Sequence, residues 1–322
     1  MPTLDPKGGP EHIADGCVRI PLPDPFVPGV TSVFVIGPSE RPWLLDVGAD
    51  TPECEAALRE SLSTLGIVPE KMRVVLSHTH LDHAGGLLRF TPGELTAHEH
   101  AIAEMREARP RSSRGPDALR RMGVADETIR ELAPGGEPVH GTPFADTHVT
   151  HSLSGSSGEL PESDGWLWLL AEGHAPGHLM VFDPGTRTLL AGDQFLRIWK
   201  TPLIVSDPDF DSLGAYLGSI RESRELEPAR ICSSHMKTME NPVEWLEDAE
   251  ASINRRLDRV SKAVNSGART AEDVLVTLYP KTRQGPLRIV FLRELLAMLR
   301  HLVVQGAAQR TIEEGVERFS PA

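Results

Sequence analysis

A run of histidines with one aspartate gives the sequence its clearest chemical signal. The stretch SHTHLDHAGG, residues 77–86, contains His78, His80, Asp82 and His83. Imidazoles and carboxylates are ligands for Zn²⁺, and also for Fe and Mn. The preceding MRVVLS is typical of a buried strand, so these side chains lie in the loop that leaves it. Because the first two histidines can turn to one side and the other pair to a neighbouring point, the spacing predicts two metals better than one.

Further candidate ligands follow other apolar runs. GHAPGHLMVFD contains His174 and His178, LLAGD ends at Asp193, and RICSSH ends at His235. All lie at the ends of apolar runs, which is where an α/β scaffold displays functional groups. These residues could complete a metal site.

The first three-quarters of the chain predict alternating strands and helices. Short apolar runs such as residues 31–37 are typical of buried strands. Residues 51–66 predict a helix with Thr51 as its N-cap and Gly66 at its end. Residues 101–150 are mixed and mostly helical, and strands return after them.

The character of the chain changes near residue 245. Three helical segments follow, and residues 307–320 could form a small hairpin, which is the element order of a winged helix. We therefore predict a catalytic domain over residues 1–245 and a C-terminal domain over residues 246–322.

Charge is unevenly distributed along the 322 residues. The net charge is −13, yet residues 251–310 carry eleven Lys and Arg against four Asp and Glu. The acidic front of the chain argues against a broad phosphate-binding surface there. The basic stretch keeps nucleic-acid binding open, although scattered basic residues on helices usually form a solvated face.

Cysteine content and hydropathy bear on the compartment. The three cysteines are scattered and form no C-x-x-C pair, so a disulfide framework or a thiolate zinc site is not expected. The N-terminal stretch has no basic region followed by an apolar one, and the most apolar runs are too short to span a bilayer. We expect a cytoplasmic protein that does not enter the membrane.

The motifs SHTHLDHAGG, APGH, AGD and SSH, in this order, resemble those of the metallo-β-lactamase-fold hydrolases over roughly residues 15–245. The resemblance implies an α+β fold, a four-layer αβ/βα sandwich with both metals at one edge of its two sheets. The tail, with INRRLDRV, resembles the winged-helix domain of a subgroup close to the lactamase-β-like endoribonuclease and the thioesterases of fungal polyketide pathways.

The resemblance also implies a ligand set, in which each metal has three ligands of its own and both share one aspartate. It assigns the first metal to His78, His80 and His178, the second to Asp82, His83 and His235, and the bridge to Asp193. The histidine content favours zinc, with Mn²⁺ and Fe as alternatives.

Several neighbouring residues receive other interpretations. His174 precedes APGH and is interpreted as a packing histidine or as one that contacts a metal-binding residue without binding the metal itself. Asp46 could orient a histidine or form a turn through its side chain. His98 and His100, in HEH, are assigned structural or surface roles.

The expected chemistry is hydrolysis. Two cations about 3.5–4 Å apart bridge a water and lower its pKa toward neutrality. The bridging hydroxide would attack an ester, thioester or lactone of a small molecule, with Asp82 or Asp193 relaying the proton.

A metal-dependent endonuclease acting on single-stranded RNA or DNA is the alternative, and a β-lactamase is a third hypothesis. We expect the helical insertion near 101–150 and the tail to shape the substrate cleft, and the tail to offer a homodimer contact.

Overall fold

The structure is a computed structural model that describes residues 8–26, 29–107, 115–132, 144–196, 203, 205, 207–281 and 287–322. It divides into two compact units, each built from three segments of the chain. The first unit comprises Met1–Ala108, Gly141–Thr201 and Glu222–Val243, and the second comprises Arg109–His140, Pro202–Arg221 and Glu244–Ala322. The domain boundary near residue 245 stays a prediction, because the second unit also takes in two segments that the sequence assigns to the catalytic domain.

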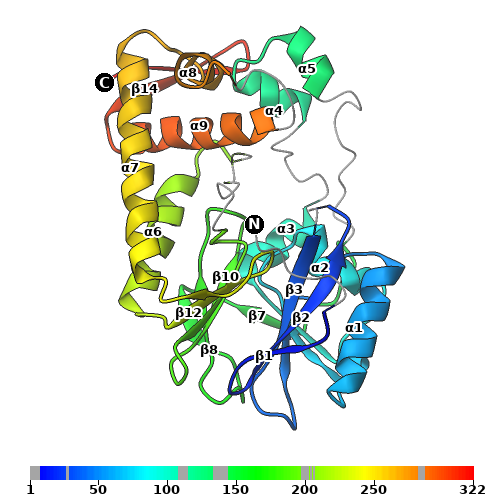
Figure 1. Ribbon diagram of the computed structural model, residues 1–322. Coiled ribbons are helices and arrows are strands. Elements are labelled where there is room, and N and C mark those ends of the chain that lie inside the picture. The colour runs from blue at the N-terminus through cyan, green and yellow to red at the C-terminus, as the bar shows by residue number, and fades with distance from the viewer. Residues whose placement is uncertain are drawn as a thin grey trace. The chain divides into compact units, whose positions relative to one another are not determined.

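The first sheet contains seven strands within the described residues and follows the chain order from β1 to β7 (Figure 1). The strands are β1 (Glu11–Ala14), β2 (Cys17–Asp24), β3 (Gly29–Ile36), β4 (Trp43–Leu45), β5 (Arg73–Val75), β6 (Glu94–His98) and β7 (His151–Leu153). Strands β1 to β4 pair antiparallel, and β4 to β7 pair parallel.

The second sheet contains six strands in the described part of the chain, in the order β13-β12-β11-β10-β9-β8. The strands are β8 (Ser157–Glu159), β9 (Leu167–Leu170), β10 (Leu179–Asp183), β11 (Thr188–Gly192), β12 (Arg230–Ser233) and β13 (Met239–Glu240). The pair β11–β12 is parallel and the other pairs are antiparallel.

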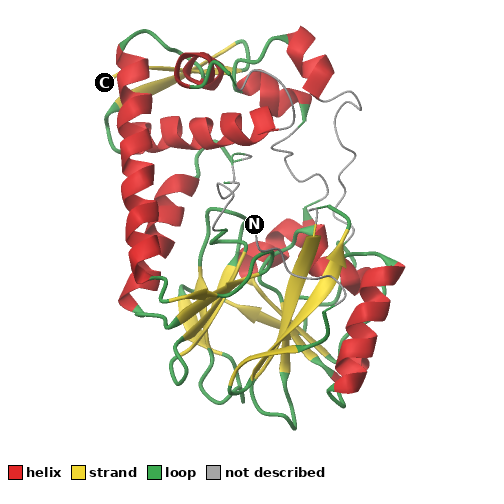
Figure 2. Ribbon diagram, viewed as in Figure 1, coloured by secondary structure: helices red, strands yellow, loops and turns green. Residues whose placement is uncertain are grey.

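A hydrophobic core lies between the two sheets. It joins Phe34 and Trp43 of the first sheet to Trp168, Val181 and Leu190 of the second. Figure 2 shows the two sheets as yellow strands with helices outside them. The alternating side chains of the strands explain this packing, because one face of strands such as β3, β4, β10 and β11 enters the shared core. The predicted α+β sandwich is confirmed.

The outer face of the first sheet is covered by helices α1 (Pro52–Thr64) and α3 (Glu99–Arg106), whose apolar side chains join a second core cluster with it. The side chain of Thr51 accepts a hydrogen bond from the backbone N–H of Cys54 at 3.1 Å, which confirms the predicted N-cap. A short helix, α2 (Leu81–Ala84), follows the loop after β5.

The second unit is mostly helical. Its elements are α4 (Pro116–Arg121), α5 (Asp126–Leu132), α7 (Val243–Asn265), α8 (Ala271–Leu278), α9 (Leu287–Val304) and the hairpin β14 (Ala308–Glu313) and β15 (Val316–Pro321). Helix α6 (Ser212–Glu225) starts in the second unit and ends in the first. The three predicted C-terminal helices and the hairpin after them are thus confirmed as elements.

Some expectations fall partly outside the described residues. In the predicted helical insertion near 101–150, residues 108–114 and 133–143 are not described, and α4 and α5 lie between them. Among the described helices, none combines the length and the apolar composition that crossing a bilayer requires.

Parallel strands decide where functional side chains gather. Asp46 follows β4 and His78 follows β5, while Asp193 follows β11 and His235 follows β12. Each of these two strand pairs is parallel, so the carboxyl ends of its strands meet at one edge of the sheet.

Candidate metal centre

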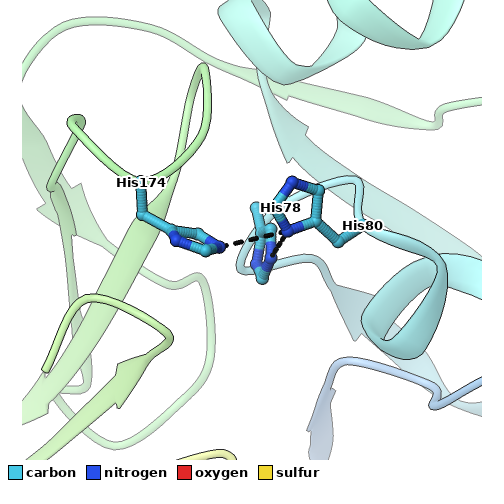
Figure 3. Close-up of side chains that lie close together, drawn as sticks. All are labelled: His78, His80 and His174. Carbon is cyan, nitrogen blue, oxygen red and sulfur yellow. Dashed lines mark hydrogen bonds between the residues drawn. The ribbon is translucent and has the colours of Figure 1, made fainter. Parts of the chain in front are cut away.

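Three histidines from two loops form the first ligand group. The ring nitrogen Nδ1 of His80 lies 3.0 Å from Nε2 of His78 and 3.1 Å from Nε2 of His174. Figure 3 shows the three rings pointing toward one another, with His174 on the loop between β9 and β10. His78 and His174 are buried, whereas His80 is exposed. The group is therefore accessible from the side of His80.

Four residues form the second group, namely Asp82, His83, Asp193 and His235. Nε2 of His235 lies 3.3 Å from Oδ2 of Asp82 and 3.2 Å from Oδ1 of Asp193. Nε2 of His83 lies 3.6 Å and 3.4 Å from the same two oxygens. Two imidazole nitrogens thus face two carboxylate oxygens in one compact arrangement.

Asp193 lies between the two groups. Its Oδ1 faces His83 and His235, and its Oδ2 lies 3.6 Å from Nε2 of His174 in the first group. The two oxygens of one carboxylate therefore point to different ligand groups.

The donor set fits divalent metals. A neutral histidine has one N–H and one acceptor nitrogen, so the three clustered ring nitrogens cannot all be satisfied by one another. In the second group, the buried atoms His83 Nε2, His235 Nε2 and Asp193 Oδ1 have no hydrogen-bond partner. Ligands about 2.1 Å from a tetrahedral metal lie about 3.4 Å apart. The separations in both groups are close to this value.

Asp46 orients a histidine in each group. Its Oδ2 accepts the Nδ1–H of His83 at 2.8 Å and the hydroxyl of Ser77 at 2.6 Å. Since the Ser77 proton is used in this bond, its oxygen accepts the Nδ1–H of His78 at 3.0 Å. Because Nδ1 keeps its proton in both histidines, Nε2 is the nitrogen that each can present to a metal in its neutral form. Of the two roles that the sequence left open for Asp46, orientation of a histidine is the one that the geometry supports.

Backbone groups orient other parts of the site. Nδ1 of His235 donates to the carbonyl oxygen of Val30 at 3.1 Å. The carbonyl oxygen of Ser77 accepts the N–H of Leu179 at 2.7 Å, which joins the two histidine-bearing loops. Hydrogen bonds with backbone groups of both sheets therefore hold the histidine-bearing loops at this edge of the sandwich.

The structure brings together six of the seven residues that the sequence proposes as ligands and places His178 outside both groups. His174 occupies the position in the first group that the sequence assigns to His178. Nε2 of His178 instead accepts the backbone N–H of Asp193 at 3.2 Å. The reason is local, because His178 directly precedes β10 and is fully buried, whereas His174 lies in the middle of the loop. The geometry therefore favours His174 as the third histidine of the first group.

In the metal-free protein, the histidines and aspartates of the second group shift one another's pKa values. Burial alone would lower the pKa of His83, but the surrounding carboxylates, with Asp193 the strongest, raise it well above its usual value. Burial opposes the charge of His235 in the same way, and Asp193 and Asp82 raise its pKa to about 10. Burial favours the neutral forms of Asp82 and Asp193, yet the charge of His83 keeps the pKa of both carboxyls below the usual range.

The pKa values of the buried histidines in the first group are shifted in the opposite direction, downward. Burial, reinforced by neighbouring imidazoles, lowers the pKa of His78 and of His174 well below the ordinary value. Burial also lowers the pKa of His178 to about 3. These histidines are neutral at pH 7, which is the form that binds a metal.

Two histidine and aspartate groups at the edge of a two-sheet sandwich define a metal-dependent hydrolase. The chain belongs to the metallo-beta-lactamase superfamily, whose family description matches residues 27–235. Members of this superfamily bind divalent metal ions, and the described side chains supply the corresponding groups.

Named relatives agree with this class. The chain is similar to the probable metallo-hydrolase YqjP of Bacillus subtilis (strain 168), with 24% identity over 278 residues that cover 82% of this chain and 85% of the relative. It is also similar to the beta-lactamase-like protein 2 homolog of Caenorhabditis elegans, with 22% identity over 313 residues that cover 96% and 91% of the two chains.

Solved structures share the fold. A beta-lactamase domain protein from Burkholderia ambifaria has a TM-score of 0.76 and 18% identity, covering 99% of this chain and 96% of that chain. A metallo-beta-lactamase family protein from Thermus thermophilus has a TM-score of 0.73 and 20% identity, covering 96% and 99%. The predicted fold class and the superfamily are confirmed.

Proposed function

We propose that the protein is a dinuclear hydrolase that cleaves an ester, thioester or lactone of a small molecule. His78, His80 and His174 would hold one metal, and Asp82, His83 and His235 the other. The observation that carries the proposal is Asp193, whose two carboxylate oxygens face different ligand groups. The many imidazole ligands favour zinc over Mn²⁺ or Fe.

The bound ions would lower the pKa of a water and polarise a substrate oxygen. The chain's own residues would supply orientation and proton transfer. Asp46 holds His78 and His83 in the tautomers that ligation needs. Asp82 or Asp193 would relay the proton of the attacking water, since both carboxylates lie within the proposed ligand groups.

The surface beside the first group supports a small, partly apolar substrate. Leu81 directly follows His80 in the sequence, and its side chain is exposed. We propose that this leucine contacts an apolar portion of the substrate, since ligand sites combine apolar side chains with a few polar groups. An acyl chain next to a hydrolysable carbonyl has this combination.

Part of the basic charge of the tail is used inside the second unit, which counts against the endonuclease alternative. Ion pairs join Arg256 to Glu294, Arg288 to Glu272, Arg300 to Glu317 and Arg310 to Asp209. Guanidinium groups that already contact carboxylates offer less to phosphates. We propose that this part is a winged-helix-like domain, residues 246–322, and its element order of three helices and a hairpin supports that assignment.

The test combines metal analysis with a substrate panel. Metal-stripped protein would be reloaded with Zn²⁺, Mn²⁺ or Fe²⁺, and activity measured on p-nitrophenyl esters, acyl-thioesters, lactones, a cephalosporin and single-stranded RNA. We expect about two metals per chain and metal-dependent cleavage of esters or thioesters. Asp193→Ala should nearly abolish cleavage and keep the fold, since the loss falls on metal binding.

Matched variants decide the ligand assignment. His174→Ala should lose one metal, whereas His151→Ala, a change at an exposed histidine of β7, should keep both. Folded, reloaded protein without bound metal would refute the proposal. Cleavage of RNA alone would favour the endonuclease, and cleavage of the cephalosporin alone the β-lactamase.

A further inference from the structure

The loop that carries His174 is closed on itself and packed on another element. Its ends are joined by the backbone N–H of Ala171, which donates to the carbonyl oxygen of His178 at 2.7 Å. Gly177 has a φ of 62°, and a Cβ there would lie 2.3 Å from the backbone nitrogen of Ala101. Only glycine allows this approach, so the loop lies directly against the first turn of α3.

One side chain, Glu172, joins the parts of this loop. Its Oε1 accepts the backbone N–H of Gly177 at 3.0 Å and the Nδ1–H of His100 at 2.8 Å. Its backbone carbonyl accepts the side-chain amide of Gln194 at 3.1 Å. The residue therefore connects the loop to α3 and to the residue after Asp193.

The anchor on α3 is itself fixed. The buried side chain of His98 caps the helix, because its Nδ1 accepts the backbone N–H of His100 at 3.3 Å. Its other nitrogen, Nε2, donates to the carbonyl oxygen of Gly155 at 3.0 Å. This arrangement gives both histidines of the HEH motif a structural task, since His98 holds the turn from which His100 reaches Glu172.

We propose that Glu172 is a positioning residue for the metal centre. By holding the loop closed and tied to α3, it keeps Nε2 of His174 at 3.1 Å from Nδ1 of His80. This inference rests on the proposed role of His174 as a ligand. Residues that hydrogen-bond a metal ligand directly change metal affinity about 10- to 100-fold when they are removed, and Glu172 acts one step further out, through the loop.

The experiment measures zinc affinity of the full chain by competition with a chromophoric chelator. Glu172→Ala should weaken the zinc at the three-histidine group about 10-fold, the lower end of the range for direct partners of a ligand, and leave the second zinc within about threefold. Glu172→Gln should retain most of the affinity, because its amide oxygen can still accept from Gly177 and His100. Glu162→Ala, which removes an exposed carboxylate of the same unit, is the matched control and should bind as wild type.

His174→Ala identifies which zinc belongs to the three-histidine group. If this variant still binds two zincs as wild type does, the proposed ligand role of His174 is wrong. If it loses one zinc while Glu172→Ala keeps both affinities, only the positioning role is overturned. Equal weakening of both zincs by Glu172→Ala would also overturn it, since that pattern indicates a general loss of structure. Should Glu172→Ala not fold, His100→Ala removes the tie to α3 alone, and the same criteria apply.

Discussion

Replacing Asp46 by Asn tests whether one carboxylate sets the protonation of both ligand groups. Asp46 is almost fully buried and has a φ of 64°, a conformation that asparagine tolerates better than most residues. The substitution keeps the size and the backbone but replaces one acceptor oxygen with an NH₂ donor. Any change in metal binding then reports on hydrogen bonding and not on a cavity.

The structure gives the expected direction. The amide oxygen of the new asparagine can still accept the backbone N–H of Ser77, which in the wild type lies 2.7 Å from Oδ1 of Asp46. The new NH₂ group would face Nδ1 of His83, which must then accept, so the one proton of the neutral imidazole lies on Nε2 instead of Nδ1. A protonated Nε2 cannot bind a metal, and the pKa of His83 falls because one of its neighbouring negative charges is gone.

The expected magnitude is a loss of about 10- to 100-fold in zinc affinity at the second group. The hydrogen bonds changed by the substitution are to a charged acceptor, each worth about 1.5–3 kcal/mol. Asp46→Ala leaves all three donors without an acceptor and should destabilise the metal-free protein by about 3–5 kcal/mol. Asp46→Asn should cost less, because it keeps part of the network.

Zinc competition and urea unfolding of the metal-free protein measure the two effects. Asp183→Asn is the matched control, since Asp183 is also buried and accepts bonds from Gly185 and Thr186 in a turn. It should change stability without changing zinc affinity. If Asp46→Asn binds both zincs as wild type does, the tautomer argument is refuted.

Three further predictions concern the protons of two histidines and a buried ion pair. At pH 7, zinc uptake by the second group should release about two protons, because His83 and His235 are charged in the metal-free protein and must become neutral; calorimetry in buffers of different ionisation enthalpy measures this, and no release would contradict it. With a folded pKa of about 10 against about 6.5 unfolded, His235 stabilises the metal-free protein fully below pH 6.5, and this contribution should disappear as the pH rises to 10, as urea titrations across that range would detect. Glu317→Gln should destabilise the second unit by about 3–5 kcal/mol, since it leaves the guanidinium of Arg300 buried without its 2.5 Å carboxylate partner; an unfolding midpoint equal to that of wild type would show that the pair contributes nothing.

Local signals in the sequence were sufficient for much of the fold. Thr51 is predicted as an N-cap from a Thr-Pro pair, and the structure shows an equally local cap at α8, where Thr270 and Asp273 form a capping box. Both interactions span only three residues, so spacing reveals them. The first metal-binding motif is visible for the same reason, because its four side chains lie within six consecutive residues of the loop after β5 and helix α2.

The remaining parts depend on contacts between distant segments. Choosing between His174 and His178 required knowing where β10 begins, which the apolar run alone did not define. The bond between His100 and Glu172 spans 72 positions, so no local pattern indicates it. The excess of basic residues in the tail suggested phosphate binding, yet pairs such as Arg300 and Glu317 use that charge internally.

The contacts of Arg300 can form only late in the synthesis of the chain. Its guanidinium donates to the carbonyl oxygens of Val205 and Asp207 at 3.0 and 2.9 Å and is neutralised by Glu317. The first unit is complete in sequence at Val243, whereas this arrangement cannot form until residue 317 has left the ribosome. The carbonyl groups of Val205 and Asp207 therefore cannot meet the complete pair of Arg300 and Glu317 until about a third of the chain has been translated after them.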